Sequence, residues 1–334
     1  MPAFSKIGIL GCGAAFPDRI RHSDDPIYAS IKRHPNAHGV IEADTFTGVR
    51  QRHVLSDGQS LMDLASNACQ AALARACMTA SQIDRLYGYL SVSEYLTPNA
   101  LFAVHRQLKL PDETMVIPIN SEFSNFLLSL IQAWEAIACG HSRSALISCA
   151  TNWSAHMDYT QGHAISIGDG AGAVLVGPDA PFEIVDYAVQ TLSARYGAMT
   201  MQSRPREDMP GREHATYRIA PEAGLASYAQ EGMEGPIRLI QGLLARHDIA
   251  PDRVGLFMHQ ATRMLLDHWH TQIGPSRLYE SLETHGNMTF VSVPANLALH
   301  WDAIKEDYLV LHALGTGFHQ IAVLLRRVPR KEFE

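Results

Sequence analysis

The chain has 334 residues, of which 46% are hydrophobic and 18% are charged, and its formal net charge is −7 at pH 7. This composition is typical of a globular protein with a substantial core, and an acidic balance without a basic run argues against a nucleic-acid partner. No stretch reaches the ~18 apolar residues of a membrane span, and the N-terminus lacks signal-peptide features. We therefore expect a cytoplasmic protein with no membrane partner.

Five cysteines are scattered along the chain without a C-x-x-C pair, namely Cys12, Cys69, Cys77, Cys139 and Cys149. Their odd number and spacing argue against a disulfide framework and a zinc knuckle, so we expect buried, reduced thiols. The 17 histidines include no H-E-x-x-H pattern, and His268 and His270 would lie on different faces of a helix. We expect neither a metal nor a cofactor.

In the first half of the chain, predicted strands alternate with predicted helices. Apolar runs and alternation predict strands over residues 6–13, 83–94, 114–120 (short and buried), 144–150, and 163–177 (two strands around a glycine turn). Periodicity and end signals predict helices over 60–76, over 97–110 beginning at Thr97-Pro98, and over 125–140 ending at Gly140.

The second half continues the alternation. Strands are predicted over 181–192, 253–261 and, around a glycine turn, 308–328, with helices over 233–249 and 262–273 and a long loop over 200–222. Each half contains a helix before a buried strand and ends in a glycine-rich hairpin. This favours a duplicated α/β protein with mostly parallel sheets, divided into residues 1–178 and 179–334.

A glycine-rich segment, "GDGAGA" over 168–173, fits G-x-G-x-x-A. A dinucleotide fingerprint needs a helix after its glycines, whereas "AVLVG" here predicts a strand. The segment therefore does not indicate dinucleotide binding.

Three polar turns follow apolar segments that we take to be strands. They contain His259, then Asn287 in "HGN", then Thr316 between Gly315 and Gly317. A buried histidine can stay neutral and act as a base or a hydrogen-bond donor, and an Asn and a backbone N–H can hold an oxyanion. A core histidine, a simple turn and a hairpin are the alternative interpretations.

A fourth polar turn, "PINSEFSNFLLSL" over 118–130, leads into a buried helix. Enzymes often place a nucleophile at such a turn, which makes Ser121, Glu122 and Ser124 candidates. The Glu122 carboxylate suits a helix N-terminus. It could cap the helix, orient His259 or bind an amine acceptor.

Taken together, these motifs resemble the β-ketoacyl-acyl carrier protein synthase III family of the thiolase superfamily over nearly the whole chain. The similarity rests on "TFTGVRQRHV" (45–54), "SVSEYLTPNA" (91–100), "GDGAGAVLV" (168–176), "HQAT" (259–262), "HGNMTFVSVP" (285–294) and "GTGF" (315–318). It implies two duplicated α/β halves in a five-layered α-β-α-β-α sandwich, usually a homodimer. It also implies an acyl thioester of CoA or acyl carrier protein as substrate.

The family's chemistry uses Cys, His and Asn, and the resemblance implies that His259 and Asn287 are the last two. Thr316 matches the residue whose N–H joins the oxyanion hole, within the turn formed by Gly315 and Gly317. The cysteine slot, however, holds Phe123, and Phe126 matches the family's Phe three residues later. Both phenylalanines are therefore expected in the acyl pocket.

Other parts of the chain do not replace what is missing. Cys139 and Cys149 follow at the far end of the helix and in the next strand. Glu42 and Phe46 occupy the positions of the Trp and Arg that clamp the CoA adenine in the family. A carboxylate there disfavours a phosphate, and the cofactor-binding residues stay unknown.

Three hypotheses follow. The first is an acyltransferase in which His259 is the base and Asn287 and the Thr316 N–H hold the oxyanion, or in which Ser121 or Ser124 is the nucleophile. The second is a decarboxylase-like or chain-length-factor-like subunit paired with a Cys-bearing homologue. The third is a non-catalytic subunit of such a heterodimer.

Overall fold

The computed structural model describes residues 6–35, 39–95, 97–202, 215–220, 223–224 and 227–329. Its main feature is a ten-stranded sheet with the order β12-β11-β13-β14-β8-β1-β7-β6-β4-β5. The first half of the chain supplies β1 (Gly8–Ala15), β4 (Arg85–Ser91), β5 (Met115–Pro118), β6 (Ala145–Thr151) and β7 (Gly170–Gly177). The second half supplies β8 (Phe182–Thr191), β11 (Val254–Phe257), β12 (Arg277–Tyr279), β13 (Tyr308–Leu314) and β14 (His319–Arg327).

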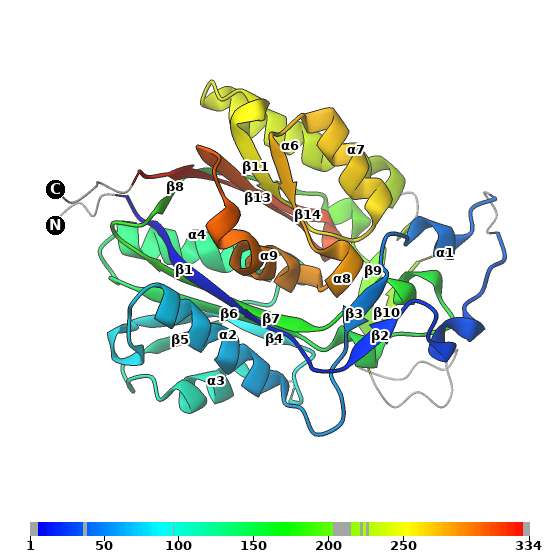
Figure 1. The fold of residues 1–334 in the computed structure, drawn as a ribbon, viewed down its shortest axis with the longest axis horizontal. Coiled ribbons are helices and arrows are strands. Elements are labelled where there is room, and N and C mark those ends of the chain that lie inside the picture. Colours follow the sequence, from blue (N-terminus) through cyan, green and yellow to red (C-terminus); the bar gives the residue numbers. More distant parts are fainter. Residues whose placement is uncertain are drawn as a thin grey trace.

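This sheet folds back on itself, because its two five-stranded parts are joined only by a short pairing of β1 with β8. Helices α4 (Asn125–Ala138) and α9 (Ser292–His300) pack between the two parts. Helices α2 (Leu61–Arg75) and α3 (Leu101–Leu108) cover one outer face, and α6 (Met233–Arg246) and α7 (Arg263–Ile273) cover the other (Figure 1). The predicted five-layered α-β-α-β-α sandwich is confirmed.

The middle layer explains why the long apolar helix has almost no polar face. Leu127 and Leu130 of α4 are fully buried between the two parts of the sheet, as are Ala295 and Leu297 of α9. A helix covered on both sides needs no solvent-facing stripe. The outer helix α2 differs, since it presents an alanine face to the sheet. Its N-cap is Ser60, whose Oγ accepts hydrogen bonds from the N–H groups of Met62 and Asp63.

Several predicted elements need correction. The sheet is mixed rather than mostly parallel, since β4 and β11 pair in parallel with both neighbours and every other pair in it is antiparallel. The glycine turn between β13 and β14 reverses the chain and makes one of these antiparallel pairs. β5 is not buried: it is an edge strand, and Met115 is 53% exposed. Residues 162–165 form a short 3-10 helix, η4 (Gly162–Ile165), where a strand was predicted.

The starts and connections of other elements also differ. α3 begins at Leu101 instead of Thr97, because the Asn99 side chain caps the Leu101 N–H and also bonds to the backbone of Leu90 in β4. The predicted loop 200–222 contains a hairpin of β9 (Met199–Gln202) and β10 (Thr216–Ile219), and residues 203–214 lie outside the described residues. The division at residue 178 stays a proposal, with β7 ending at Gly177 and β8 beginning at Phe182. No helix among the described residues is long and apolar enough to cross a membrane.

The contact between β4 and β6 makes a first prediction. Gly88 has φ +129°, and a Cβ at this position would lie 1.9 Å from the backbone oxygen of Ser148 in β6. Gly88→Ala should therefore lower the free energy of unfolding by more than about 3 kcal/mol. The measurement is urea unfolding followed by circular dichroism.

Gly242→Ala is the matched control for this substitution. Gly242 lies in α6 with open space around its Cα. Alanine there should raise the free energy of unfolding by about 0.5–1 kcal/mol. Equal effects of the two substitutions would contradict the close approach of β4 and β6.

Candidate active site

The predicted nucleophile slot is filled by an aromatic ring. Phe123 has φ +73°, a left-handed conformation that few residues with a side chain adopt. Its ring is 7% exposed, lies 4.9 Å from the Trp153 ring, and stacks on the His259 ring at 5.5 Å between centroids and an interplanar angle of 22°. The side chain in the slot therefore contacts the candidate base directly but offers no nucleophilic atom.

His259, Asn287 and Phe123 line one small cavity of about 50 Å³, here called the imidazole pocket. Gly315 and His163 line it as well. The structure therefore brings together residues from the segment after β11, from the turn before α4, from the segment before α9 and from the β13–β14 connection. This cluster was the central expectation from the sequence, apart from His163.

His259 lies directly after β11, next to β13. Its N–H donates to the carbonyl of His312 at 3.0 Å. Burial lowers the pKa of His259 to about 4, and a backbone contact from Thr289 opposes this only in part. The imidazole is therefore neutral at pH 7, and its Nδ1 has no hydrogen-bond partner among the described residues.

Asn287 is fixed by its own backbone and by its side-chain oxygen. Its N–H donates to Ser166 O at 2.7 Å, and its Oδ1 accepts from the Thr289 N–H at 2.9 Å. Because Oδ1 is occupied, the amide Nδ2 is the group left to donate to a ligand. The segment that carries Asn287 follows the short helix α8 (Leu282–His285) and not a strand, which corrects the sequence prediction.

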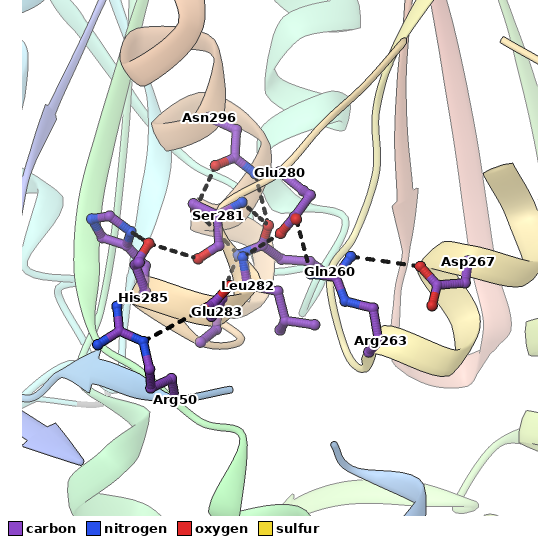
Figure 2. A network of polar contacts seen from close by, with 12 residues as sticks. Arg50, Gln260, Arg263, Asp267, Glu280, Ser281, Leu282, Glu283, His285 and Asn296 are labelled. Atoms are coloured by element: carbon purple, nitrogen blue, oxygen red, sulfur yellow. Dashed lines mark hydrogen bonds and ion pairs between the residues drawn. The ribbon is translucent and has the colours of Figure 1, made fainter. Parts of the chain in front are cut away.

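A buried hydrogen-bond network holds His259 and Asn287 in register. Gln260 donates through Nε2 to Gly286 O at 2.7 Å, and its Oε1 accepts from the Asn296 Nδ2 at 2.8 Å and from the Ser281 N–H at 3.2 Å. Ser281 Oγ donates to Asn296 Oδ1 at 2.6 Å (Figure 2). The residue after His259 is thereby tied to the segment that ends at Asn287.

The glycine turn does not offer the expected donor. The Thr316 N–H donates to the carbonyl of Glu122 at 2.9 Å, and the Gly315 N–H donates to His319 O at 2.8 Å. The Thr316 N–H is thus occupied, and we correct its assignment to an oxyanion hole. Gly315 does line the imidazole pocket, whereas Gly317 does not.

Three other candidates also lie outside the imidazole pocket. Ser124 is fully buried, and its Oγ donates to His319 O at 2.9 Å, so the hydroxyl fastens the turn to β14. Ser121 accepts the Ser124 N–H at 2.7 Å through its carbonyl and does not line the pocket. Phe126 belongs to the hydrophobic core around α4. A serine nucleophile and a pocket role for Phe126 are therefore not supported.

Glu122 faces a second cavity of about 390 Å³, here called the carboxylate cavity, which Ser91 and Trp153 also line. Its Oε1 accepts from Ser91 Oγ at 2.6 Å, and Ser91 Oγ accepts from Trp153 Nε1 at 2.9 Å. Its Oε2 is buried without a hydrogen-bond partner among the described residues. Burial raises the pKa of Glu122 to about 7. Glu122 does not cap α4, whose N-cap is Ser124.

A residue that the sequence did not single out completes the imidazole pocket. His163 in η4 is 3% exposed, and its Nδ1 lies 2.7 Å from Glu42 Oε1. Glu42 Oε2 accepts the Gly162 N–H at 3.1 Å. Burial opposes ionisation of Glu42, yet these hydrogen bonds hold its pKa below the ordinary value. The sequence signal for His163 was hidden because its segment was assigned to a strand.

No cysteine lines either cavity. All five are free thiols. Cys12, Cys69 and Cys149 are buried as expected, and burial raises the pKa of Cys12 and Cys69 to about 12. Cys77 and Cys139 are exposed, which corrects the prediction that all the thiols are buried.

The buried carboxyl of Glu122 makes the second prediction. Its pKa rises from 4.5 to about 7 on folding. Between these values the folded protein holds a proton that the unfolded chain has lost, so stability falls as the pH rises. The free energy of unfolding of the unmodified protein should fall by about 2 kcal/mol between pH 5 and pH 8, and Glu122→Gln should abolish this fall. Urea unfolding at both pH values measures the difference. Glu113→Gln, at an exposed position, should leave the pH dependence unchanged, and identical profiles for Glu122→Gln and the unmodified protein would contradict the buried carboxyl.

Known proteins are similar to this chain in fold and in sequence. A sequence model described as 3-oxoacyl-[acyl-carrier-protein (ACP)] synthase III matches residues 118–193. The priming β-ketosynthase of the R1128 polyketide pathway superposes with a TM-score of 0.84 at 20% identity over 98% of both chains. The 3-oxoacyl-(acyl carrier protein) synthase III of Pseudomonas aeruginosa gives 0.80 at 21% identity over 97% of this chain and 100% of that chain.

Two curated relatives extend this similarity in sequence. The β-ketoacyl-[acyl-carrier-protein] synthase III of Rhodospirillum centenum is 26% identical over 95% of this chain and 98% of its own. That of Gloeobacter violaceus is 30% identical over 84% of this chain and 88% of its own. With the fold and the motifs in place, the chain belongs to the β-ketoacyl-[acyl-carrier-protein] synthase III family, whose members are acyl-thioester condensing enzymes.

Proposed function

We propose that the protein transfers an acyl group from a thioester of CoA or of an acyl carrier protein directly to an amine or hydroxyl acceptor. The observation that carries this proposal is the imidazole pocket, where His259 and Asn287 share one cavity while Phe123 occupies the nucleophile slot. A covalent acyl-enzyme needs a nucleophile at that slot. Direct attack on the thioester needs only a base and a group that holds the oxyanion.

The proposed reaction uses the groups as they are placed. The acceptor's nitrogen or oxygen attacks the thioester carbonyl while His259 takes the proton that the acceptor releases. Asn287 Nδ2 donates to the carbonyl oxygen as it becomes an oxyanion. The C–S bond then breaks, and the thiolate leaves with the proton that the imidazole received. Because burial keeps His259 neutral, it is free to accept a proton at pH 7.

Unpaired polar atoms favour catalysis over a purely structural role. His259 Nδ1, His163 Nε2 and Glu122 Oε2 are buried around the two cavities without hydrogen-bond partners among the described residues. Each such atom costs about 1–3 kcal/mol unless a ligand or water pairs with it. A subunit kept only for its surface would gain stability by replacing these side chains with apolar ones.

We further propose that the chain works as a homodimer, or as a heterodimer with a Cys-bearing homologue. β5 supports this, because it is an edge strand and Met115 at its start is 53% exposed. An exposed edge strand is a surface on which a second chain can pair.

The third prediction tests the mechanism. The assay offers acetyl-, malonyl- and octanoyl-CoA and the matching carrier-protein thioesters as donors, with hydroxylamine or ethanol as acceptors. His259→Ala should lower thiol release by 10²–10⁴-fold with the donor that the unmodified protein uses. His270→Ala, at an exposed position on α7, is the control and should leave turnover unchanged.

Other outcomes of this experiment separate the alternatives. Unchanged activity in His259→Ala would contradict the mechanism. Release of CO2 from malonyl thioesters without acyl transfer would favour the decarboxylase-like subunit. A stable complex with a Cys-bearing homologue and no turnover of any thioester would favour the non-catalytic subunit.

The fourth prediction restores the missing nucleophile. Phe123→Cys should place a thiol beside the His259 ring, where Phe123 now stacks, and should open the pocket. Incubation with acetyl-CoA should then acylate the protein, because the new thiolate attacks the thioester and CoA leaves as the thiol. Intact-protein mass spectrometry measures the added acetyl group.

Phe123→Ala opens the same space without a thiol and should remain unmodified, which makes it the control. A folded Phe123→Cys variant that gains no acetyl group would contradict the placement of this slot beside a functional thioester site.

A further inference from the structure

His163, which is buried, and Glu42, which is partly exposed, form a pair that the family resemblance does not account for. One carboxylate oxygen of Glu42 lies 2.7 Å from His163 Nδ1, and the other accepts the Gly162 N–H at 3.1 Å. A carboxylate that accepts from Nδ1 fixes both the orientation of the ring and its tautomer. The proton of the neutral imidazole therefore resides on Nδ1, and Nε2 carries the lone pair.

His163 belongs to the wall of the imidazole pocket. His163 is 3% exposed, and its Nε2 is buried without a partner among the described residues. An aromatic series connects it with the nucleophile slot: the Tyr217 ring lies 5.4 Å from the His163 ring and 6.0 Å from the Phe123 ring. His163 and His259 thus line the same cavity.

The two imidazoles differ in what holds them. His259 has a backbone contact from Thr289 and an aromatic ring beside it but no carboxylate, so little offsets the effect of burial on its protonated form. His163 has a carboxylate on the far side of its ring, which stabilises the imidazolium that forms when Nε2 takes a proton. A base oriented by a third group in this way is the arrangement that activates acceptors in acyl transfer.

We infer that His163 is the general base for the acceptor, with Glu42 as its positioning residue. This inference rests on the proposed acyl transfer and reassigns one proton within it. Nε2 of His163 takes the proton from the acceptor as the new C–N or C–O bond forms. His259 then stays neutral and, with Asn287, faces the oxyanion, and the imidazolium of His163 returns the proton to the departing thiolate.

The size of the pocket narrows the class of acceptor. About 50 Å³ accommodates the reacting end of a small molecule, since one water occupies about 30 Å³ in the liquid. The acceptor's reacting group is therefore a water, an unbranched hydroxyl or a primary amine. Thioester hydrolysis is included in this class.

The test is chemical rescue with octanoyl-CoA as the thioester and hydroxylamine as the acceptor. His163→Ala should lower the rate of thiol release by 10²–10⁴-fold. Added imidazole should then raise the rate of this variant at least tenfold. Glu42 and the Gly162 N–H remain in this variant to seat the added imidazole in the space left by the ring. Glu42→Gln should lower kcat by about tenfold with KM unchanged.

His163→Gln keeps a donor for Glu42 but has no basic nitrogen, so it should fold and still lose turnover. His268→Ala is the matched control, because His268 also pairs with a carboxylate, Glu234 at 3.1 Å, but on the surface of α7. It should show neither a loss nor a response to imidazole.

Each remaining outcome decides the inference. Turnover within twofold of the unmodified protein in His163→Ala, or a loss without rescue, would overturn the base assignment and leave Glu42–His163 as a fastening between α1 (Glu42–Thr45) and η4. The proposed function would survive either result if His259→Ala still abolished turnover. An unmodified protein inactive with every thioester would overturn both.

Discussion

The stacking of Phe123 on His259 is the contact on which the rest of the site depends. The turn before α4 holds residue 123 at a positive φ and directs its side chain at the imidazole. In the family this is where a thiol would meet the histidine. With a ring there, the imidazole loses a reactive neighbour and becomes more deeply buried, which favours its neutral form. The same ring also contacts Trp153, which lines the carboxylate cavity. One aromatic side chain therefore fills the predicted slot and connects the walls of the two cavities.

The framework around the slot is held by contacts that do not involve Phe123. Gln260 ties the segment after β11 to Ser281, Gly286 and Asn296 through three side-chain hydrogen bonds, and none of these bonds involves Phe123. Such a network destabilises the fold unless every member is paired, because a buried polar group without a partner loses its hydrogen bonds to water and gains none in the protein. Its integrity keeps His259 and Asn287 in the same pocket. The positions of His259 and Asn287 therefore do not depend on a thiol at residue 123.

Elements that depend on local residue patterns could be predicted from the sequence. Most of the buried strands and the apolar helix α4 follow from hydrophobic patterning, and the motif order led to the five layers. Helix α9 escaped prediction because Pro294 lies in its first turn and burial between two parts of a sheet leaves it no polar stripe. Thr316 and Ser124 were misassigned because a backbone partner, Glu122 O in one case and His319 O in the other, cannot be seen in a residue type. The Glu42–His163 pair joins positions 121 residues apart, and no local pattern announces such a contact.

Losing a covalent intermediate changes what an acyltransferase must bind. When the enzyme has a nucleophilic thiol, the acyl group stays bound to it while the thiol of the donor leaves and the acceptor enters. One cavity can then bind the donor and the acceptor one after the other. Without that nucleophilic thiol, thioester and acceptor must be present together, because the attack is a single encounter. Two cavities of unequal size meet this requirement: about 390 Å³ beside Glu122 and about 50 Å³ beside His259, with Met199 in the wall of both. The larger can hold an acyl chain bearing a hydrogen-bond donor for Glu122, and the smaller confines the reacting atoms between two imidazoles and an amide. Phe123 lines the smaller cavity and its ring contacts Trp153, which lines the larger one, so one aromatic contact connects the walls of the two cavities.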